Sequence, residues 1–169
     1  MHFSIRRIEP ADAADMARLS NAPGVVRHTS QLPCHTEAAW RKKLDSLPAD
    51  CHSLVAVDEQ DHVIANAGLL LNTRPRCRHA ATLFLVVHDD WQGQGVGKAL
   101  LTALLDLADN WLGLKRIELM AQADNARAIG LYERFGFRHE GISRQDILQD
   151  GVYVDSVNMA RLTGLEGRA

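Results

Sequence analysis

Hydrophobic residues recur along the chain at two spacings, which separate predicted strands from predicted helices. Short alternating or continuous apolar stretches predict strands at residues 3–8, 53–57, 63–71, 80–88 and 117–121. Helical spacing of apolar residues predicts helices at residues 9–20, 36–47, 96–111 and 125–135. Residues 21–33 contain one glycine and two prolines and are expected to form a loop. The segments 137–148 and 152–162 are expected to pair antiparallel, turning at Asp150-Gly151.

This order of elements predicts an α+β fold, with a mixed, mostly antiparallel central sheet flanked by helices. The strand at 80–88 is almost wholly apolar and is therefore expected at the centre of the sheet, covered on both faces. The chain shows no linker, repeat or low-complexity segment, so a single domain over residues 1–169 is predicted.

Composition and charge narrow the classes of function. Hydrophobic residues make up 46% and charged residues 24%, as in ordinary globular proteins, and the net charge of −2 provides no field for nucleic acid or a membrane. No apolar stretch suits a signal peptide or a membrane span. Cys34, Cys51 and Cys77 are scattered, and no compact set of His and Cys suggests a metal. A cytoplasmic protein with reduced cysteines and no metal is expected.

The strongest chemical pattern is a glycine-rich turn between the strand at 80–88 and the following helix. It consists of Gln92, Gly93, Gln94, Gly95, Val96, Gly97 and Lys98. A helix start offers several backbone N–H groups without intrahelical acceptors, and glycines let an anion approach them closely. With the charge of Lys98, the turn predicts a phosphate or pyrophosphate site. A tight turn without a ligand is the alternative.

Two common phosphate motifs do not match this turn. A Walker A loop needs Gly where Gln92 stands and Ser or Thr where Ala99 stands. A dinucleotide-binding GxGxxG needs Gly or Ala where Lys98 stands, or at Leu100 in the other frame.

The pattern Gln92-x-x-Gly95-x-Gly97 resembles the coenzyme A motif of the GNAT superfamily of N-acetyltransferases, Gln/Arg-x-x-Gly-x-Gly/Ala. The segment 125–137 resembles a second element of that superfamily, N-x-x-A-x-x-x-Y-x-x-x-G-F. Residues 109–112, 116–119, 151–155 and 159–161, with Arg74-Pro75-Arg76, are similar to bacterial L-amino acid N-acetyltransferases. The resemblance covers essentially the whole chain and implies the GNAT acyl-CoA N-acyltransferase fold.

The resemblance also implies roles for individual residues. The glycine-rich turn would bind the pyrophosphate of acetyl-CoA, and the backbone near Leu85, Val86 and Val87 would pair with pantetheine. Tyr132 would be the general acid that protonates the departing sulfur; without the resemblance it reads as a core tyrosine packing with Phe135. Asn125 would bind the coenzyme, act as an N-cap, or do both.

The general base is not identified by the sequence. Many relatives carry Glu or Asp where this chain has Thr82, which cannot act as a base near neutral pH. His28, His79, His88 and Glu118 are the candidates near this strand in the sequence. Arg74, Arg76 and Arg78 either pair with an acceptor carboxylate or form a solvated basic loop.

These residues predict an acetyl-CoA-dependent N-acetyltransferase acting on a primary amine, such as the α-amine of a free amino acid, by direct attack in a ternary complex. The resemblance implies an acceptor site between residues 21–33, the next helix and the final hairpin, and implies a homodimer. Tyr153 and Asp155 are acceptor-side or dimer candidates. A protein, polyamine or toxin acceptor, and a non-catalytic acyl-CoA-binding module, are the alternatives.

Overall fold

The computed structural model describes residues 2–164 and contains seven strands, five α-helices and short helical turns. The strands hydrogen-bond in the order β1-β2-β3-β4-β5-β7-β6. The pairs β1–β2, β2–β3, β5–β7 and β6–β7 are antiparallel, and β4–β5 is parallel. The predicted mixed, mostly antiparallel sheet is confirmed, with β4 fourth of seven strands.

The chain divides into two compact units. The described residues of the first unit are 2–70 and 84–106, and those of the second are 71–83 and 107–164. Strand β4 (Ala80–Val87) contributes to both units. The single domain predicted over residues 1–169 stays a prediction.

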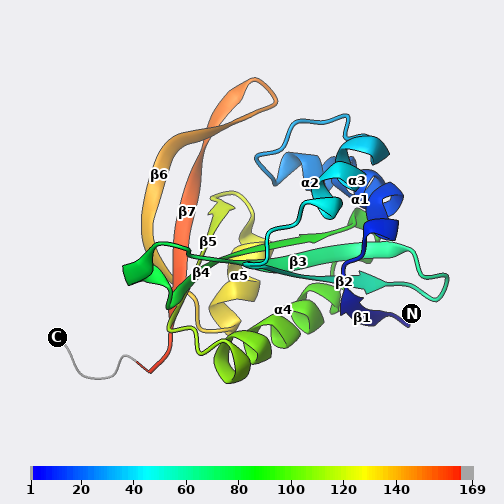
Figure 1. The fold of residues 1–169 in the computed structure, drawn as a ribbon. Helices are drawn as coiled ribbons and strands as arrows, with labels where there is room; N and C mark the ends of the chain where they lie inside the picture. Colours follow the sequence, from blue (N-terminus) through cyan, green and yellow to red (C-terminus); the bar gives the residue numbers. More distant parts are fainter. Residues whose placement is uncertain (1, 165–169) are drawn as a thin grey trace. The chain divides into compact units, whose positions relative to one another are not determined.

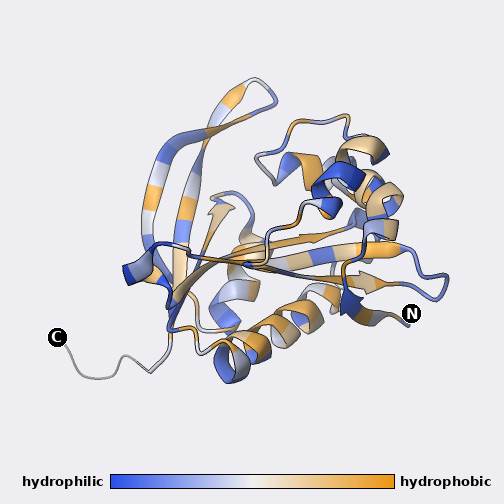
Figure 2. Ribbon diagram, in the orientation of Figure 1, coloured by the Kyte–Doolittle hydropathy of each residue, from blue (hydrophilic) through white to orange (hydrophobic). Residues whose placement is uncertain are grey.

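The first unit contains two groups of helices on a small sheet (Figure 1). The strands are β1 (Ser4–Arg7), β2 (Cys51–Val57) and β3 (Val63–Leu71), and the last residue of β3, Leu71, belongs to the second unit. The helices α1 (Ala13–Ser20), α2 (Pro23–Arg27) and α3 (Glu37–Asp45) lie on one side, and α4 (Val96–Asp106) lies on the other. Figure 2 shows the hydrophobic residues that dominate α4, β2 and β3. Burial of these faces on both sides explains why the strands are nearly continuous in apolar residues.

Local signals set the ends of these elements. The Thr36 side chain accepts a hydrogen bond from the Ala39 N–H (3.2 Å) and caps α3, as predicted. The first helix begins as the 3-10 turn Pro10–Asp12, and its buried Asp12 receives a bidentate hydrogen bond from Arg6 (2.8 and 2.9 Å). Residues 21–33 are not wholly a loop, because α2 forms within them after Pro23, which suits a first helical turn.

The second unit contains β5 (Arg116–Gln122), α5 (Ala126–Arg134) and the hairpin of β6 (Arg138–Gln149) and β7 (Val152–Leu162). The hairpin turns at Asp150 (φ 49°) and Gly151 (φ 81°), the left-handed pair of a type I′ turn, as predicted. Figure 2 shows a mixture of hydrophilic and hydrophobic residues along both strands, and β6 is mostly exposed. The helix predicted to reach residue 111 ends in a π-helical turn, Leu107–Trp111.

Candidate active site

The glycine-rich turn lies in the first unit, between β4 and α4. A 3-10 turn, Asp89–Trp91, follows β4, and residues 92–95 then form tight turns before α4 begins at Val96. Gly93 and Gly95 have φ angles of 78° and 84°, which side chains rarely adopt. A Cβ at either glycine would meet no atom within 4 Å. The backbone dihedrals, not lack of space within the protein, therefore explain these two glycines.

The start of α4 presents backbone N–H groups to an anion. The first helical hydrogen bond joins the Ala99 N–H to the Gly95 carbonyl (2.9 Å). The N–H groups of Val96, Gly97 and Lys98 precede that bond and have no acceptor within the helix. The positive end of the helix dipole and the exposed Lys98 side chain add favourable charge. The turn thus has the geometry and electrostatics that a pyrophosphate requires.

The two glutamines of the turn hold its backbone. The Gln92 side-chain amide donates to the Val87 carbonyl (3.2 Å) and to the Asp89 carboxylate (3.3 Å). The Gln94 amide donates to the Asp90 carbonyl (2.6 Å). The side chains of both predicted coenzyme residues therefore shape the turn from within, a role that their sequence pattern alone does not show.

The predicted pantetheine residues Leu85, Val86 and Val87 form the end of β4 in the same unit as the turn. All three side chains are half-buried, and Val86 packs against the hydrophobic core. The Val87 carbonyl accepts from Gln92, and the His88 N–H donates to the Ile64 carbonyl (2.8 Å). Of the three side chains, Val86 contributes to the core, and the backbone at the end of β4 is tied to the turn through Gln92.

The remaining predicted coenzyme and catalytic residues, Asn125 and Tyr132, lie on α5 in the second unit. The Asn125 side chain accepts a hydrogen bond from the Ala128 N–H (3.1 Å), which confirms it as the N-cap. Its own N–H donates to the Gln122 carbonyl (3.0 Å). The bonds fix the start of α5 directly after β5.

Tyr132 is the buried residue of α5, with 6% of its surface exposed. Its ring lies 5.8 Å from that of Phe137, tilted by 60°, so the packing partner is Phe137 rather than Phe135. Burial raises the pKa of Tyr132 to about 12. The phenol, which is protonated at neutral pH at its ordinary pKa, therefore keeps its proton over a wider pH range.

Thr82 lies where β4 and β5 pair. The parallel register joins Ala80 to Arg116, Ala81 to Ile117 and Thr82 to Glu118. Within the described residues of the second unit, Thr82–Glu118 is the last pair of this register. Thr82 is exposed, so the prediction that β4 is covered on both faces is wrong at this position. Register partners in neighbouring strands place their side chains on the same face, so Glu118 lies beside Thr82.

Glu118 is part of an ion-pair group, not an isolated carboxylate. The Arg116 guanidinium donates to Glu118 (3.0 Å) and to Glu140 of β6 (2.8 Å). The hydrogen bond from Arg116 lowers the pKa of Glu140 below its usual value. Glu118 is bound to a cation that also links β5 to β6, so its carboxylate takes part in a structural ion pair.

The other residues considered as base or acceptor ligand occupy varied positions. His79 is exposed, His28 follows α2, and the His88 ring accepts from the Asp90 N–H (3.4 Å). The three arginines of the basic loop flank or lie within the 3-10 turn Pro75–Cys77 and are exposed: Arg74, Arg76 and Arg78. Across residues 2–164, no three His, Cys, Asp or Glu residues are grouped to hold a metal ion.

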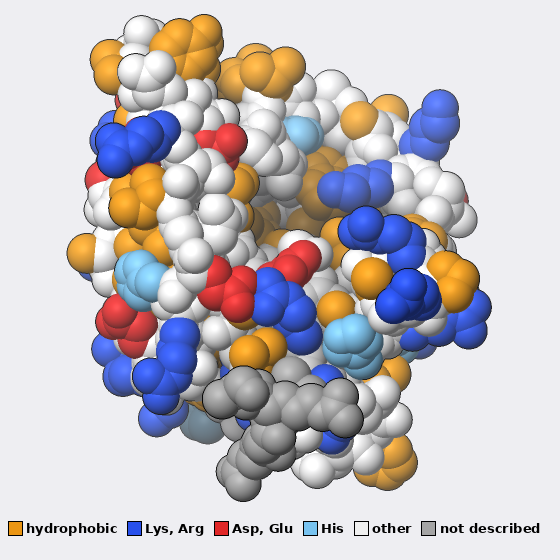
Figure 3. Space-filling view, turned by 90° about the vertical axis from the view of Figure 1, so that its left-hand side faces the viewer, with side chains coloured by type: hydrophobic (Ala, Val, Ile, Leu, Met, Phe, Trp, Pro, Cys, Tyr) orange, Lys and Arg blue, Asp and Glu red, His pale blue; other side chains and the backbone are white. Residues whose placement is uncertain are grey.

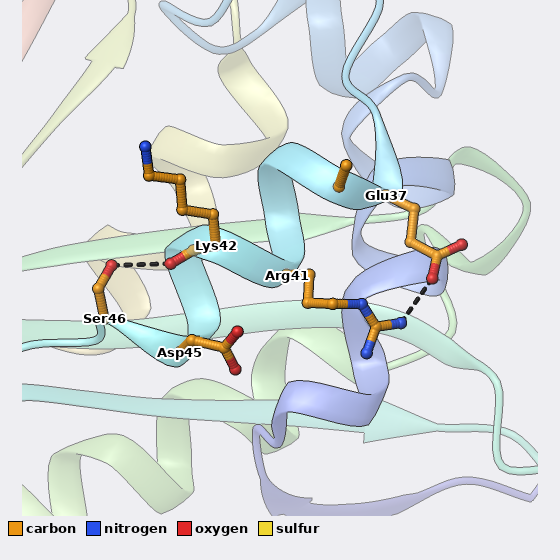
Figure 4. A pocket seen from close by; sticks show the side chains of 6 residues that line it. Glu37, Arg41, Lys42, Asp45 and Ser46 are labelled. Carbon is orange, nitrogen blue, oxygen red and sulfur yellow. Dashed lines mark hydrogen bonds and ion pairs between the residues drawn. The ribbon is translucent and has the colours of Figure 1, made fainter.

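A shallow hollow lies along the outer side of α3 in the first unit (Figure 4). Its lining residues are Glu37, Ala38, Arg41, Lys42, Asp45 and Ser46. Arg41 pairs with Glu37 (2.6 Å), and the Ser46 hydroxyl donates to the Lys42 carbonyl (2.8 Å). Because these polar groups already bind one another on an exposed helix face, the hollow does not compete with the glycine-rich turn as a candidate site.

Comparison with known proteins agrees with this geometry. Residues 19–137 match the sequence model of the Acetyltransferase (GNAT) family. The chain is 34% identical over 158 residues to the L-amino acid N-acetyltransferase AaaT of Escherichia coli (strain K12), covering 94% of this chain and 96% of that relative. It is 30% identical over 162 residues to spermidine N(1)-acetyltransferase of Vibrio cholerae, covering 93% and 91%.

Solved structures give the same fold. The crystal structure of spermidine N-acetyltransferase from Vibrio cholerae, in complex with CoA and spermine, has a TM-score of 0.84 at 23% identity, covering 95% of both chains. A phosphinothricin acetyltransferase from Sinorhizobium meliloti, in complex with AcCoA, has a TM-score of 0.84 at 22% identity, covering 96% of this chain and 89% of that one. These structures show the fold. The family model over residues 19–137 and the 34% identity to a curated N-acetyltransferase establish that the chain belongs to the acetyltransferase (GNAT) family and is an N-acetyltransferase.

Proposed function

We propose that the protein transfers the acetyl group of acetyl-CoA to the α-amine of a free amino acid. The observation that carries this acceptor is the 34% identity to an L-amino acid N-acetyltransferase, because it extends over 94% of this chain and 96% of the relative. Within the first unit, the acceptor lies beside α2 and α3 in this proposal, as the resemblance implies.

The coenzyme is held mainly by main-chain groups. The N–H groups at the start of α4 bind the pyrophosphate, with Lys98 supplying charge, and Gly93 and Gly95 allow its close approach. The backbone of residues 85–87 pairs with the pantetheine amides, and Asn125 contributes from the start of α5. The short pairing of β4 with β5 supports this role, because backbone groups beyond the paired residues need other partners.

The acetyl transfer is a direct displacement. The neutral amine attacks the thioester carbonyl carbon, the new C–N bond forms, and the C–S bond then breaks as its electron pair moves to sulfur. The nitrogen of the tetrahedral intermediate releases one proton to solvent, Tyr132 donates its phenolic proton to the departing thiolate, and the Tyr132 phenolate then regains a proton from solvent, leaving the amide and free CoA thiol. The match of its segment to the family pattern supports Tyr132 as the acid, and its phenol, with a pKa of about 12, keeps its proton until the thiolate forms. Thr82 has no proton-accepting role, so no protein base is assigned.

The test is free-thiol release from acetyl-CoA across all twenty amino acids, with polyamines and short peptides assayed alongside. Turnover with one or a few amino acids is expected. Selective turnover of spermidine or of a peptide N-terminus would contradict the amino acid acceptor. Turnover of spermidine would instead favour a polyamine acceptor, as in the name of the Vibrio cholerae relative. Calorimetric titration with acetyl-CoA alone tests coenzyme binding separately from the choice of acceptor.

The protein forms a homodimer through the outer edge of the β6–β7 hairpin in this proposal. Four hydrophobic residues of the hairpin are at least 60% exposed: Ile142 (61%), Leu148 (60%), Val152 (63%) and Tyr153 (64%). Figure 3 shows hydrophobic side chains at the top of its face, where the hairpin turns. The edge strand β6 also offers backbone groups to a second copy, as edge strands do.

Substituting Val152 with lysine is expected to convert the dimer to monomers in sedimentation velocity, because a charge would then lie in an apolar contact. Leu32→Lys is the matched control, since Leu32 is 82% exposed in the first unit. A monomeric wild-type protein would contradict the homodimer.

No helix within residues 2–164 is long and apolar enough to cross a bilayer. The cytoplasmic location stays a prediction.

A further inference from the structure

Asp89 links two segments of the first unit that are far apart in the sequence. It is the first residue of the 3-10 turn between β4 and the glycine-rich turn. One carboxylate oxygen, Oδ2, accepts the Gly24 N–H at the start of α2 (2.8 Å). The other, Oδ1, accepts the Gln92 side-chain amide (3.3 Å). A single carboxylate therefore holds the first turn of α2 and the first residue of the coenzyme turn together.

The contact with α2 is closely fitted. Gly24 lies in the first turn of α2, where its N–H has no acceptor within the helix. A Cβ built on Gly24 would lie 2.3 Å from Oδ1 and 2.9 Å from Cγ of Asp89. Any larger residue at position 24 must therefore displace the carboxylate from its present place, including its bond to Gln92.

The contact with the coenzyme turn fixes an amide orientation. Because Gln92 Nε2 donates to both Asp89 and the Val87 carbonyl, the nitrogen of the amide is directed at the end of β4. The Gln92 N–H also donates to the Asp89 carbonyl (3.3 Å). Asp89 thus fixes the entry of the turn through both its side chain and its backbone.

We propose that Asp89 is a positioning residue that couples binding of the coenzyme at the glycine-rich turn to binding of the acceptor beside α2. The inference rests on the proposed function, which assigns the turn to acetyl-CoA and α2 to the acceptor side. An anion that orders the turn also fixes Gln92 and Asp89, and hence the start of α2. Each ligand then increases the affinity for the other, since such coupling is reciprocal.

The first test is Asp89→Ala, measured by calorimetry. Loss of the charged hydrogen-bond acceptor is expected to weaken CoA binding about tenfold. In the wild type, saturating CoA is expected to tighten amino acid binding at least about fivefold. In Asp89→Ala this increase is expected to disappear, whereas Asp89→Asn, which retains one acceptor oxygen, should keep part of it. Asp90→Ala is the control, because the Asp90 side chain is 86% exposed and its carboxylate lies 3.7 Å from the His88 ring, whereas Asp89 makes the bonds to Gly24 and Gln92.

The second test is a double-mutant cycle with Gly24→Ala. This substitution is expected to weaken CoA binding in the wild type and to add nothing in Asp89→Ala, where the clashing carboxylate is absent. If the losses of CoA affinity in the two single variants add in the double variant, the inference is overturned. It is also overturned if Asp89→Ala lowers the Tm but keeps the wild-type affinities for CoA and amino acid and the wild-type coupling between them. If the wild-type protein fails to bind acetyl-CoA, the proposed function is overturned. If the wild-type protein turns over amino acids and Asp89→Ala shows the same coupling between CoA and amino acid as the wild type, only the role of Asp89 is overturned.

Discussion

Tyr132→Phe is expected to lower kcat for thiol release about 100-fold or more while leaving acetyl-CoA binding unchanged. The substitution removes one hydroxyl from a buried side chain and keeps the ring that packs against Phe137. The thiolate then leaves without a positioned acid, while the affinity for the coenzyme, which depends on the main chain of the turn, is unaffected. Single-turnover kinetics and calorimetry measure the two effects separately.

The control for this prediction is Tyr153→Phe, the same change at the chain's second tyrosine, which is 64% exposed on the hairpin. Because Tyr153→Phe keeps the aromatic ring of the proposed hairpin contact, its single-turnover rate at saturating acceptor is expected to equal that of the wild type, and any acceptor-side role of Tyr153 would change KM for the acceptor. Burial raises the pKa of Tyr132 to about 12, so its acid form persists as the pH rises and is lost only near that value. The pH profile of kcat should therefore show no falling limb from Tyr132 below about pH 11. Near-normal kcat in Tyr132→Phe would rule out the acid role.

Gly95→Val is expected to weaken acetyl-CoA binding about 100-fold, because about two charge-assisted hydrogen bonds to the pyrophosphate would be lost. Gly95 has a φ of 84°, which a β-branched residue does not readily adopt, and its side chain would occupy the space where the anion approaches the N–H groups. Equilibrium binding of acetyl-CoA measures the loss directly.

Gly113→Val separates backbone strain from loss of the site. Gly113 also has a positive φ, 62°, with no atom within 4 Å of a built Cβ, but it lies after the π-helical turn and outside the proposed coenzyme residues. Both variants carry a left-handed backbone cost of about 1–2 kcal/mol. Unchanged affinity in Gly95→Val, or an equal loss of affinity in Gly113→Val, would contradict the pyrophosphate site.

Short-range signals made most secondary structure predictable. Apolar spacing located the strands and the long helices, and Thr36 and Asn125 cap helices as their residue types suggest. The left-handed Asp150-Gly151 pair likewise forms the hairpin turn. The five-residue helix α2 was missed, because one turn and a half is too short for a helical period to show.

Features that depend on distant partners were not predictable from the sequence. The strand β6 bulges between Ser143 and Ile147, where Gln145 has a positive φ and its N–H donates to the Asp155 carboxylate (2.8 Å). Asp155 was considered only as an acceptor-side or dimer residue, and this structural role depends on the pairing register of the hairpin. No local pattern distinguishes such an aspartate from a solvated one.

The sequence by itself determined the order of the elements, the conformational need for glycine at positions 93 and 95, and the residue types that resemble an acetyltransferase. These depend on dihedral preferences, apolar period and motif spacing, all of which act within a few residues. Only the tertiary structure decided that Tyr132 is buried and its pKa raised, that Arg116 binds Glu118, and that Asp89 joins α2 to the coenzyme turn. Desolvation and hydrogen bonds across 65 residues depend on which atoms folding brings together, and residue order does not specify those contacts locally.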